Sequence, residues 1–126
     1  MKTMIFLVIS VIIFIGFAVW TQNILVSSAA DLGQHLDRLE SAVKNDNWES
    51  AGNRLEALTR VWNENRDIWQ ILINHEEVDN IDSTLARVKQ LVEVREKTDS
   101  LAEIAVLKLF ILHIPEKESL SIVNII

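Results

Sequence analysis

A nearly unbroken apolar run opens the chain, from Met4 to Trp20. Only Ser10 and Gly16 interrupt it. As a helix the run would measure about 25 Å, and extended to Val26 about 34 Å, enough to cross a hydrocarbon core of about 30 Å. The sequence therefore predicts a membrane anchor in residues 1–26 and a separate domain in residues 27–126.

A cleaved secretory signal is the main alternative to an anchor. Lys2 supplies the basic start of such a signal, and Ser28-Ala29-Ala30 supplies small residues for a cleavage site. The apolar run is, however, longer than the core of about 7 to 15 residues that a signal needs, and residues 21–26 separate it from that site. We favour an uncleaved single-pass anchor over a cleaved signal or a helix buried in a larger complex.

The charges on either side of the run predict its orientation. Lys2 precedes it, whereas Asp31, Asp37 and Glu40 make the following flank acidic. The flank richer in Lys and Arg stays in the cytoplasm, and aromatic residues such as Trp20 mark the end of a span. We therefore expect a protein of the cell membrane with a cytoplasmic N-terminus and an extracytoplasmic C-terminal domain.

Composition limits what the domain after the anchor can do. All 18 acidic residues lie in it against 11 of the 12 basic ones, so it carries a net charge of −7. This charge argues against binding nucleic acid or anionic lipid headgroups. The absence of cysteine excludes disulfides, thiol chemistry and cysteine-ligated zinc. With one proline and three glycines, strands joined by tight turns are disfavoured.

Apolar periodicity predicts an all-α fold, an antiparallel bundle of about four helices behind the single transmembrane helix. The first stripe falls in residues 31–44, which can continue the anchor helix without a break. Asn45-Asp46-Asn47 predicts a turn, because Asn and Asp favour turns and helix caps. A second helix follows over residues 48–62. Asn63-Glu64-Asn65 then predicts a second turn, with Asn65 or Asp67 as the next cap.

The second half of the domain is predicted to contain two long helices and a short one. Residues 68–97 form one helix with a kink or a break at Asn74-His75. Ser100 and Glu103 have the spacing of a capping box that starts a new helix, unless residues 93–100 are only the exposed face of the preceding one. Residues 101–114 are apolar almost all round and too few for a second span, so we expect a central buried helix. Pro115 is expected to end it and to open a short last helix.

One helical face gathers groups that bind cations. His75, Asp79 and Asp82 are spaced i, i+4, i+7, and Glu76 crowds the same turn. An imidazole with carboxylates could hold a divalent cation or act as an oriented general base. We favour the plainer interpretation, a solvated acidic face with a capping or hydrogen-bonded histidine. The chain has no phosphate-binding loop, Ser-His-Asp set or Cys-His pair, so we expect neither an enzyme nor a cofactor.

Two apolar features are interpreted as core or as a partner surface. Trp48, Trp62 and Trp69 fall within 22 residues, and we favour core packing over an exposed aromatic hot spot. The end of the chain is apolar enough either to pack across the bundle or to contact a partner. The residues of this end that we regard as candidates for partner binding are Leu120, Ile122, Ile125 and Ile126.

Several short motifs together resemble those of an uncharacterised family, a domain of unknown function found in short, N-terminally membrane-anchored helical proteins of endospore-forming Firmicutes. The motifs are the N-terminal span, Trp48-x-x-Ala51, Trp62, His75-x-Glu77-x-x-x-Ile81, and the ending from His113-Ile114 to Leu120-Ser121-x-x-Asn124-Ile125. The resemblance implies a helical domain without an established activity. It also implies companionship with small multi-pass membrane proteins encoded nearby.

These observations lead to one principal hypothesis and one alternative. The principal hypothesis is a non-enzymatic, membrane-tethered helical module that binds a protein partner, an integral membrane protein of the same envelope. The alternative is an extracytoplasmic sensor of a ligand or metal ion that uses the face of His75, Glu76, Asp79 and Asp82.

Overall fold

Four helices and the short turns between them make up the protein, in a computed structural model that describes the backbone of residues 1–125 and the side chains of residues 1–115. The helices are α1 (Lys2–Lys44), α2 (Trp48–Leu72), α3 (His75–Glu93) and α4 (Lys97–Ile125). They cover 92% of the chain, and the described residues contain no strand. The all-α class predicted from the sequence is confirmed.

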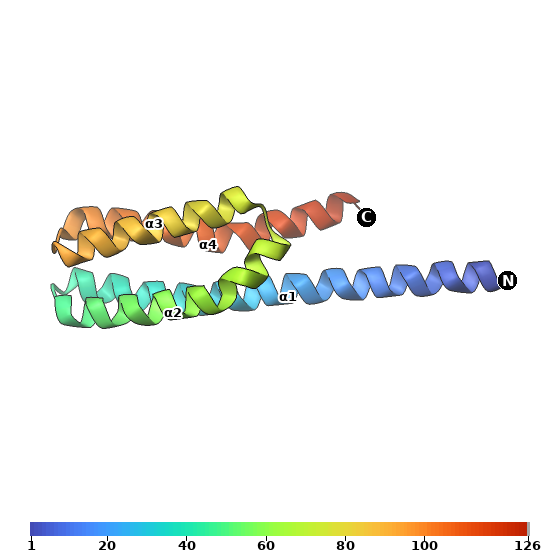
Figure 1. The fold of residues 1–126 in the computed structure, drawn as a ribbon, viewed down its shortest axis with the longest axis horizontal. Helices are drawn as coiled ribbons and strands as arrows, with labels where there is room; N and C mark the ends of the chain where they lie inside the picture. Colours follow the sequence, from blue (N-terminus) through green and yellow to red (C-terminus); the bar gives the residue numbers. More distant parts are fainter. Residues whose placement is uncertain (126) are drawn as a thin grey trace.

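The first helix serves two purposes in one unbroken element. Its N-terminal end projects beyond the rest of the molecule (Figure 1), and none of the residues in its most apolar stretch is buried. From Leu25 onward α1 buries one side in the core. The helix is long and apolar enough to cross a membrane. The expectation that the apolar helix continues without a break into the first helix of the bundle is confirmed.

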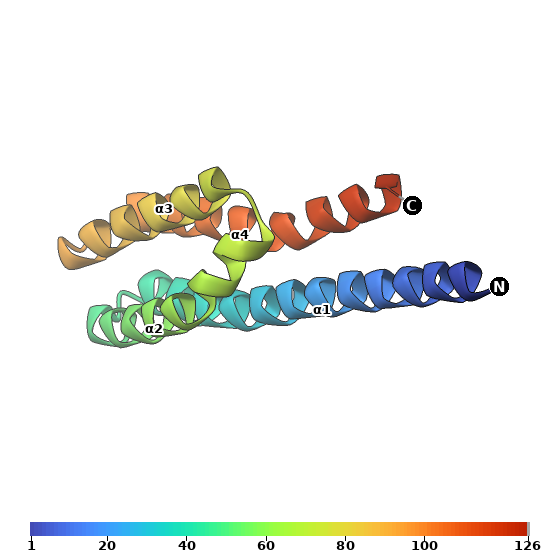
Figure 2. The same cartoon turned by 45° about the vertical axis from the view of Figure 1, so that its right-hand side comes forward.

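The four helices alternate in direction around one core. α1 packs against α2 and α4, and α3 packs against α4 and, less extensively, against α2. Figures 1 and 2 show the α1–α2 and α3–α4 turns together at the end farthest from the N-terminus. The α2–α3 connection lies at the opposite end, which we call the span-proximal end of the bundle. The largest fully buried side chains are Trp62, Trp69, Leu32, Leu36, Leu39, Leu58, Ile81, Ile104, Leu107, Ile111, Val43 and Val78.

The two turns at the far end have the same construction. Asp46 and Arg95 adopt left-handed backbone angles, with φ of 56° and 59°. The next residue in each turn donates its main-chain N–H to a carbonyl five residues back, at 2.9 Å in one turn and 3.0 Å in the other, the pattern of a Schellman cap. Lys97 Nζ lies 3.2 Å from Asp46 Oδ2 and links the two turns. The turn predicted at residues 45–47 is confirmed.

The turn predicted at residues 63–65 is wrong, because α2 continues without a break to Leu72. The Asn65 amide donates to the carbonyl of Val61 at 2.8 Å, so this side chain bonds within the helix instead of ending it. The helix ends at Leu72, and Ile73 and Asn74 connect it to the next one. The irregularity predicted near Asn74-His75 is therefore a break and not a kink. The Asn74 side chain caps α3 by accepting from Glu76 N at 3.0 Å.

Both expected boundaries of the last helix are also wrong. α4 begins at Lys97, so Ser100 lies inside it and is buried. The Glu103 carboxylate accepts from Arg87 Nε of α3 at 3.1 Å, so it bridges two helices and forms no capping box. Pro115 lies inside α4, which continues to Ile125. A proline costs a helix one main-chain hydrogen bond, and here α4 gains a contact with α1, because Gln22 Nε2 donates to the Pro115 carbonyl at 2.9 Å.

Candidate functional site

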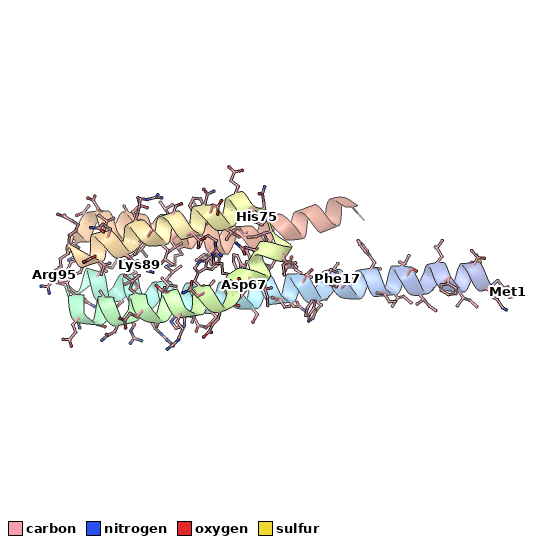
Figure 3. The ribbon with its side chains drawn as sticks, in the orientation of Figure 1. Met1, Phe17, Asp67, His75, Lys89 and Arg95 are labelled. Carbon is pink, nitrogen blue, oxygen red and sulfur yellow. The ribbon has the colours of Figure 1, made fainter. Side chains whose placement is uncertain are left out.

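His75 lies at the first position of α3, at the span-proximal end of the bundle (Figure 3). His75, Glu76 and Asp79 are exposed. Carboxylates in the first turn of a helix interact favourably with its dipole, which explains Glu76 without a ligand. Within the part of the chain that the structure describes, there is no group of three or more His, Cys, Asp or Glu side chains that could hold a metal ion.

Asp82, the most buried member of that predicted face, points toward α2. Trp62 Nε1 donates to its Oδ1 at 2.7 Å. Arg66 donates from Nε to its Oδ1 at 3.2 Å and from Nη2 to its Oδ2 at 2.8 Å, a bidentate pair. Asp82 therefore ties α3 to α2, and the structure does not bring it together with His75. The sequence analysis missed Arg66, because a pairing across two helices follows no periodicity along the chain.

Two tryptophans of α2 form the centre of the core. The rings of Trp62 and Trp69 meet edge to face, with centroids 5.5 Å apart and planes at 84°. Trp69 Nε1 donates to Ser28 Oγ of α1 at 2.8 Å, so each indole N–H has a partner. Trp48 is half-buried and packs against the same core. The interpretation of these tryptophans as core residues is confirmed.

One face of α4 is apolar and has no cover within the described part of the chain. The opposite face is the buried one, with Ile104, Leu107, Ile111 and Ile114 in the core. The prediction of a central buried helix is therefore wrong for half of its circumference. A helix that is apolar on two opposite sides needs two sets of neighbours, and the bundle supplies one. The exposed residues of this face, which we call the α4 outer face, are Ala102, Ala105, Val106, Leu109 and, at the edge beside α1, Leu112.

A lysine in the middle of this apolar helix fastens it to α1. Lys108 pairs with Asp37 and, at 3.3 Å, with Glu40. The hydrogen bond to Asp37 is the main cause that raises the pKa of the Lys108 ammonium. A hydrogen bond from Lys44, together with Lys108, lowers the pKa of the Glu40 carboxyl although burial opposes the shift. Leu112 also meets α1, since its Cδ2 lies 3.4 Å from the position that a Cβ on Gly33 would take.

The terminal residues predicted to bind a partner lie outside the described side chains. The backbone of α4 includes Leu120, Ile122 and Ile125, and Ile126 is outside the described residues altogether. The prediction about these four residues therefore remains a prediction. The α4 outer face lies upstream of them on the same helix.

Two hollows on the surface are large enough for a ligand or a side chain of another protein. One, of about 720 Å³, lies between α2 and α3 and has Leu55 and Val92 among its lining residues. Charged residues of both signs also line it, namely Glu56, Arg60, Glu64, Lys89 and Glu93. The other, of about 640 Å³, lies along α1 between Trp20 and Asp31. Neither hollow is lined by the predicted face around His75.

A family model matches residues 19–125, which is most of the chain. The chain belongs to the family Domain of unknown function (DUF4363). No curated protein and no solved structure matches it. The uncharacterised, all-helical character implied by the resemblance is confirmed.

The extent of the DUF4363 match separates two parts of α1. It begins at Val19, near the end of the apolar run, and takes in the tryptophan pair and the α4 outer face. Most of the apolar run lies outside the match. The family model therefore describes the bundle, and a span is indicated only by the length and composition of α1.

The link between α2 and α3 makes the stability of this DUF4363 protein depend on pH. Partial burial works to raise the pKa of the Asp82 carboxyl, but hydrogen bonds from Arg66 and Trp62 and the charge of Arg66 outweigh it and hold the pKa below its usual value. A carboxyl with a lowered pKa in the folded state stabilises the fold above its unfolded pKa of about 3.9, and this contribution is lost as the pH falls through the folded pKa.

We expect Asp82→Asn to weaken this link at neutral pH and to leave it unchanged in acid. The amide oxygen can still accept from Trp62, but the ion pair with Arg66 is lost, so the free energy of unfolding should fall by about 1 kcal/mol at pH 7. The difference between the variant and the parent should shrink below a pH of about 4. Urea titrations of the full chain in detergent micelles at both pH values measure it. Asp79→Asn, on the exposed side of α3, is the control and should change the stability at neither pH.

Proposed function

We propose that this protein is a non-enzymatic, membrane-tethered helical module that binds an integral membrane protein. The observation that carries the proposal is the α4 outer face. Leu109 is 64% exposed and Leu112 is 47% exposed, and they continue the apolar stripe that begins at Ala102. A continuous apolar stripe on a small domain marks a contact surface more often than an isolated exposed leucine does.

The apolar run supports the tether. Phe6, Phe14 and Phe17 are each more than half exposed, and Figure 3 shows Phe17 on the part of α1 that projects from the bundle. A surface of this kind is stable in lipid and would aggregate in water. Lys2 before the run and the acidic residues after it favour a cytoplasmic N-terminus and an extracytoplasmic bundle. We infer that the protein resides in the cell membrane in this orientation.

The position of the α4 outer face indicates which part of the partner it contacts. Leu112 lies opposite Gly33, which is eleven residues beyond Gln22 on α1 and therefore about 17 Å farther from the span. Ala102, ten residues before Leu112, lies about 15 Å farther still. The partner must therefore present an apolar surface that rises well above the bilayer. The resemblance to membrane-anchored proteins that accompany multi-pass proteins in endospore-forming Firmicutes supports this type of partner.

A charge placed in the α4 outer face should abolish binding without unfolding the protein. We expect Leu109→Glu to keep the melting temperature of the parent, because the side chain is exposed and the bundle loses no core contact. Partner crosslinked in native membranes should no longer co-purify with this variant. Val94→Glu is the matched control, since Val94 is 54% exposed and lies in the turn at the far end of the bundle. Partner recovery at the parental level with folded Leu109→Glu would refute the proposed surface.

A further inference from the structure

The span-proximal end of the bundle lies very close to where α1 would leave the membrane. No linker separates the two, because α1 is a single helix. The hydrogen bond from Trp69 to Ser28 fixes the register of α2 along α1. Since α2 runs antiparallel to α1, Ile71 is level with Val26. A hydrocarbon core of about 30 Å that begins at Met4 would end near Asn23, so Ile71 lies only about 5 Å beyond it, at the depth of the headgroups.

Exposed aliphatic side chains of α2 are concentrated at this end. Ile71 is 82% exposed, more than any other large apolar side chain described in the bundle, and Ile68 is 42% exposed. Val26, at the same level of α1, is 50% exposed. At the far end Val94 is the one large aliphatic residue exposed in the turns. An isoleucine that is almost fully exposed to water contributes no free energy of apolar burial to the fold. Burial of the same side chain in the interfacial layer would be favourable.

The backbone of α4 approaches the same level. The Gln22 side chain donates to the Pro115 carbonyl, so the backbone of α4 comes within reach of α1 near the base of the span. From there α4 continues to Ile125, about 15 Å further, in the direction of the apolar run, as Figures 1 and 2 both show. The sequence changes along this stretch from the charged Glu116-Lys117-Glu118 to a mostly apolar end.

We propose that the span-proximal end of the bundle is seated in the headgroup layer of the bilayer, with Ile68 and Ile71 in contact with lipid. This inference rests on the proposed membrane span, and it adds a second membrane contact made by the bundle itself. The neighbours Asp67 and Glu76 are exposed and acidic. They would be repelled by an anionic surface, so the contact should favour zwitterionic lipid.

A pair of single-cysteine variants tests the contact, because the chain has no cysteine of its own. Ile71→Cys and Val94→Cys exchange two exposed aliphatic residues at opposite ends of the bundle. Each purified full chain is labelled with a polarity-sensitive fluorophore and reconstituted into phosphatidylcholine vesicles. The probe at residue 71 should emit at shorter wavelength and be quenched by spin-labelled lipid, whereas the probe at residue 94 should be quenched by aqueous iodide. Adding phosphatidylglycerol should weaken the lipid quenching at residue 71.

The outcomes separate this inference from the proposal on which it rests. If vesicles float with the protein but iodide quenches both probes equally, the seated bundle is refuted and the span stands. If the protein does not float with the vesicles, the span itself fails, and both proposals fail with it. If the probe at residue 71 is shielded in native membranes but open to iodide in vesicles, a protein covers Ile71, and the lipid contact is refuted.

Discussion

Replacement of Trp69 by alanine is expected to destabilise the bundle more than any other single truncation. Trp69 is fully buried, packs edge to face on Trp62 and donates to Ser28, so it joins α2 to α1 and to the core at once. Truncation of a buried tryptophan costs about 3–5 kcal/mol. That is a large share of the roughly 5–15 kcal/mol by which a domain is stable. Urea unfolding of the full chain in micelles, followed by circular dichroism, measures the loss.

A more conservative replacement divides this loss between ring and hydrogen bond. Trp69→Phe keeps most of the aromatic surface but removes the indole N–H, which leaves the Ser28 hydroxyl without this donor. We expect a loss of about 1–2 kcal/mol from the missing bond and the smaller ring. If Trp69→Ala were no more destabilising than Trp69→Phe, the ring contact with Trp62 would contribute little, and the described core would be wrong at its centre.

Replacement of Leu107 by glutamate is expected to unfold the bundle. Leu107 is 1% exposed and faces the core from α4. An unpaired carboxylate there would be desolvated without a compensating cation, and such changes cost more than about 4 kcal/mol. In micelles, the full-length variant should show no cooperative unfolding transition in urea, and protease should digest it rapidly.

The neighbouring face of the same helix provides the matched comparison. Leu109 lies two residues beyond Leu107 and is mostly exposed, so Leu109→Glu should leave the urea midpoint close to that of the parent. The two variants have the same composition and differ only in the face of α4 that carries the charge. Equal destabilisation by both would mean that the α4 outer face is covered in the folded protein, which would contradict the proposed contact surface.

The sequence was sufficient to predict the helical class, the unbroken first helix and the first turn, because these features depend on local patterns. A run of apolar residues without a turn signal predicts one continuous helix over its whole length. The prediction of a turn at Asn45-Asp46-Asn47 was correct because the apolar stripe ends where the turn-forming residues begin. At Asn63-Glu64-Asn65 the same kind of local signal failed. Trp62 and Trp69 on either side both enter the core, and their burial holds the intervening turn helical against its weak propensity.

The candidate sites were less predictable, because they depend on which helices meet. Spacing correctly placed His75, Asp79 and Asp82 along one helix. It could not show that Asp82 is engaged by Arg66, since that pairing is decided by the packing of α2 on α3. The exposure of one face of α4 could not be predicted from the sequence for a similar reason. A helix that is apolar all round looks the same in sequence whether two neighbours cover it or four.

The absence of a joint between the apolar run and the bundle has a mechanical consequence. α1 is one unbroken helix, so a tilt or rotation of its apolar N-terminal part would turn the whole bundle by the same angle. Each residue of an α-helix advances the azimuth by about 100°. One residue more or fewer between Trp20 and Leu25 would therefore turn the α4 outer face about a quarter of the way round the axis. The direction in which the α4 outer face points relative to the apolar run is thus fixed by the number of residues in a single helix.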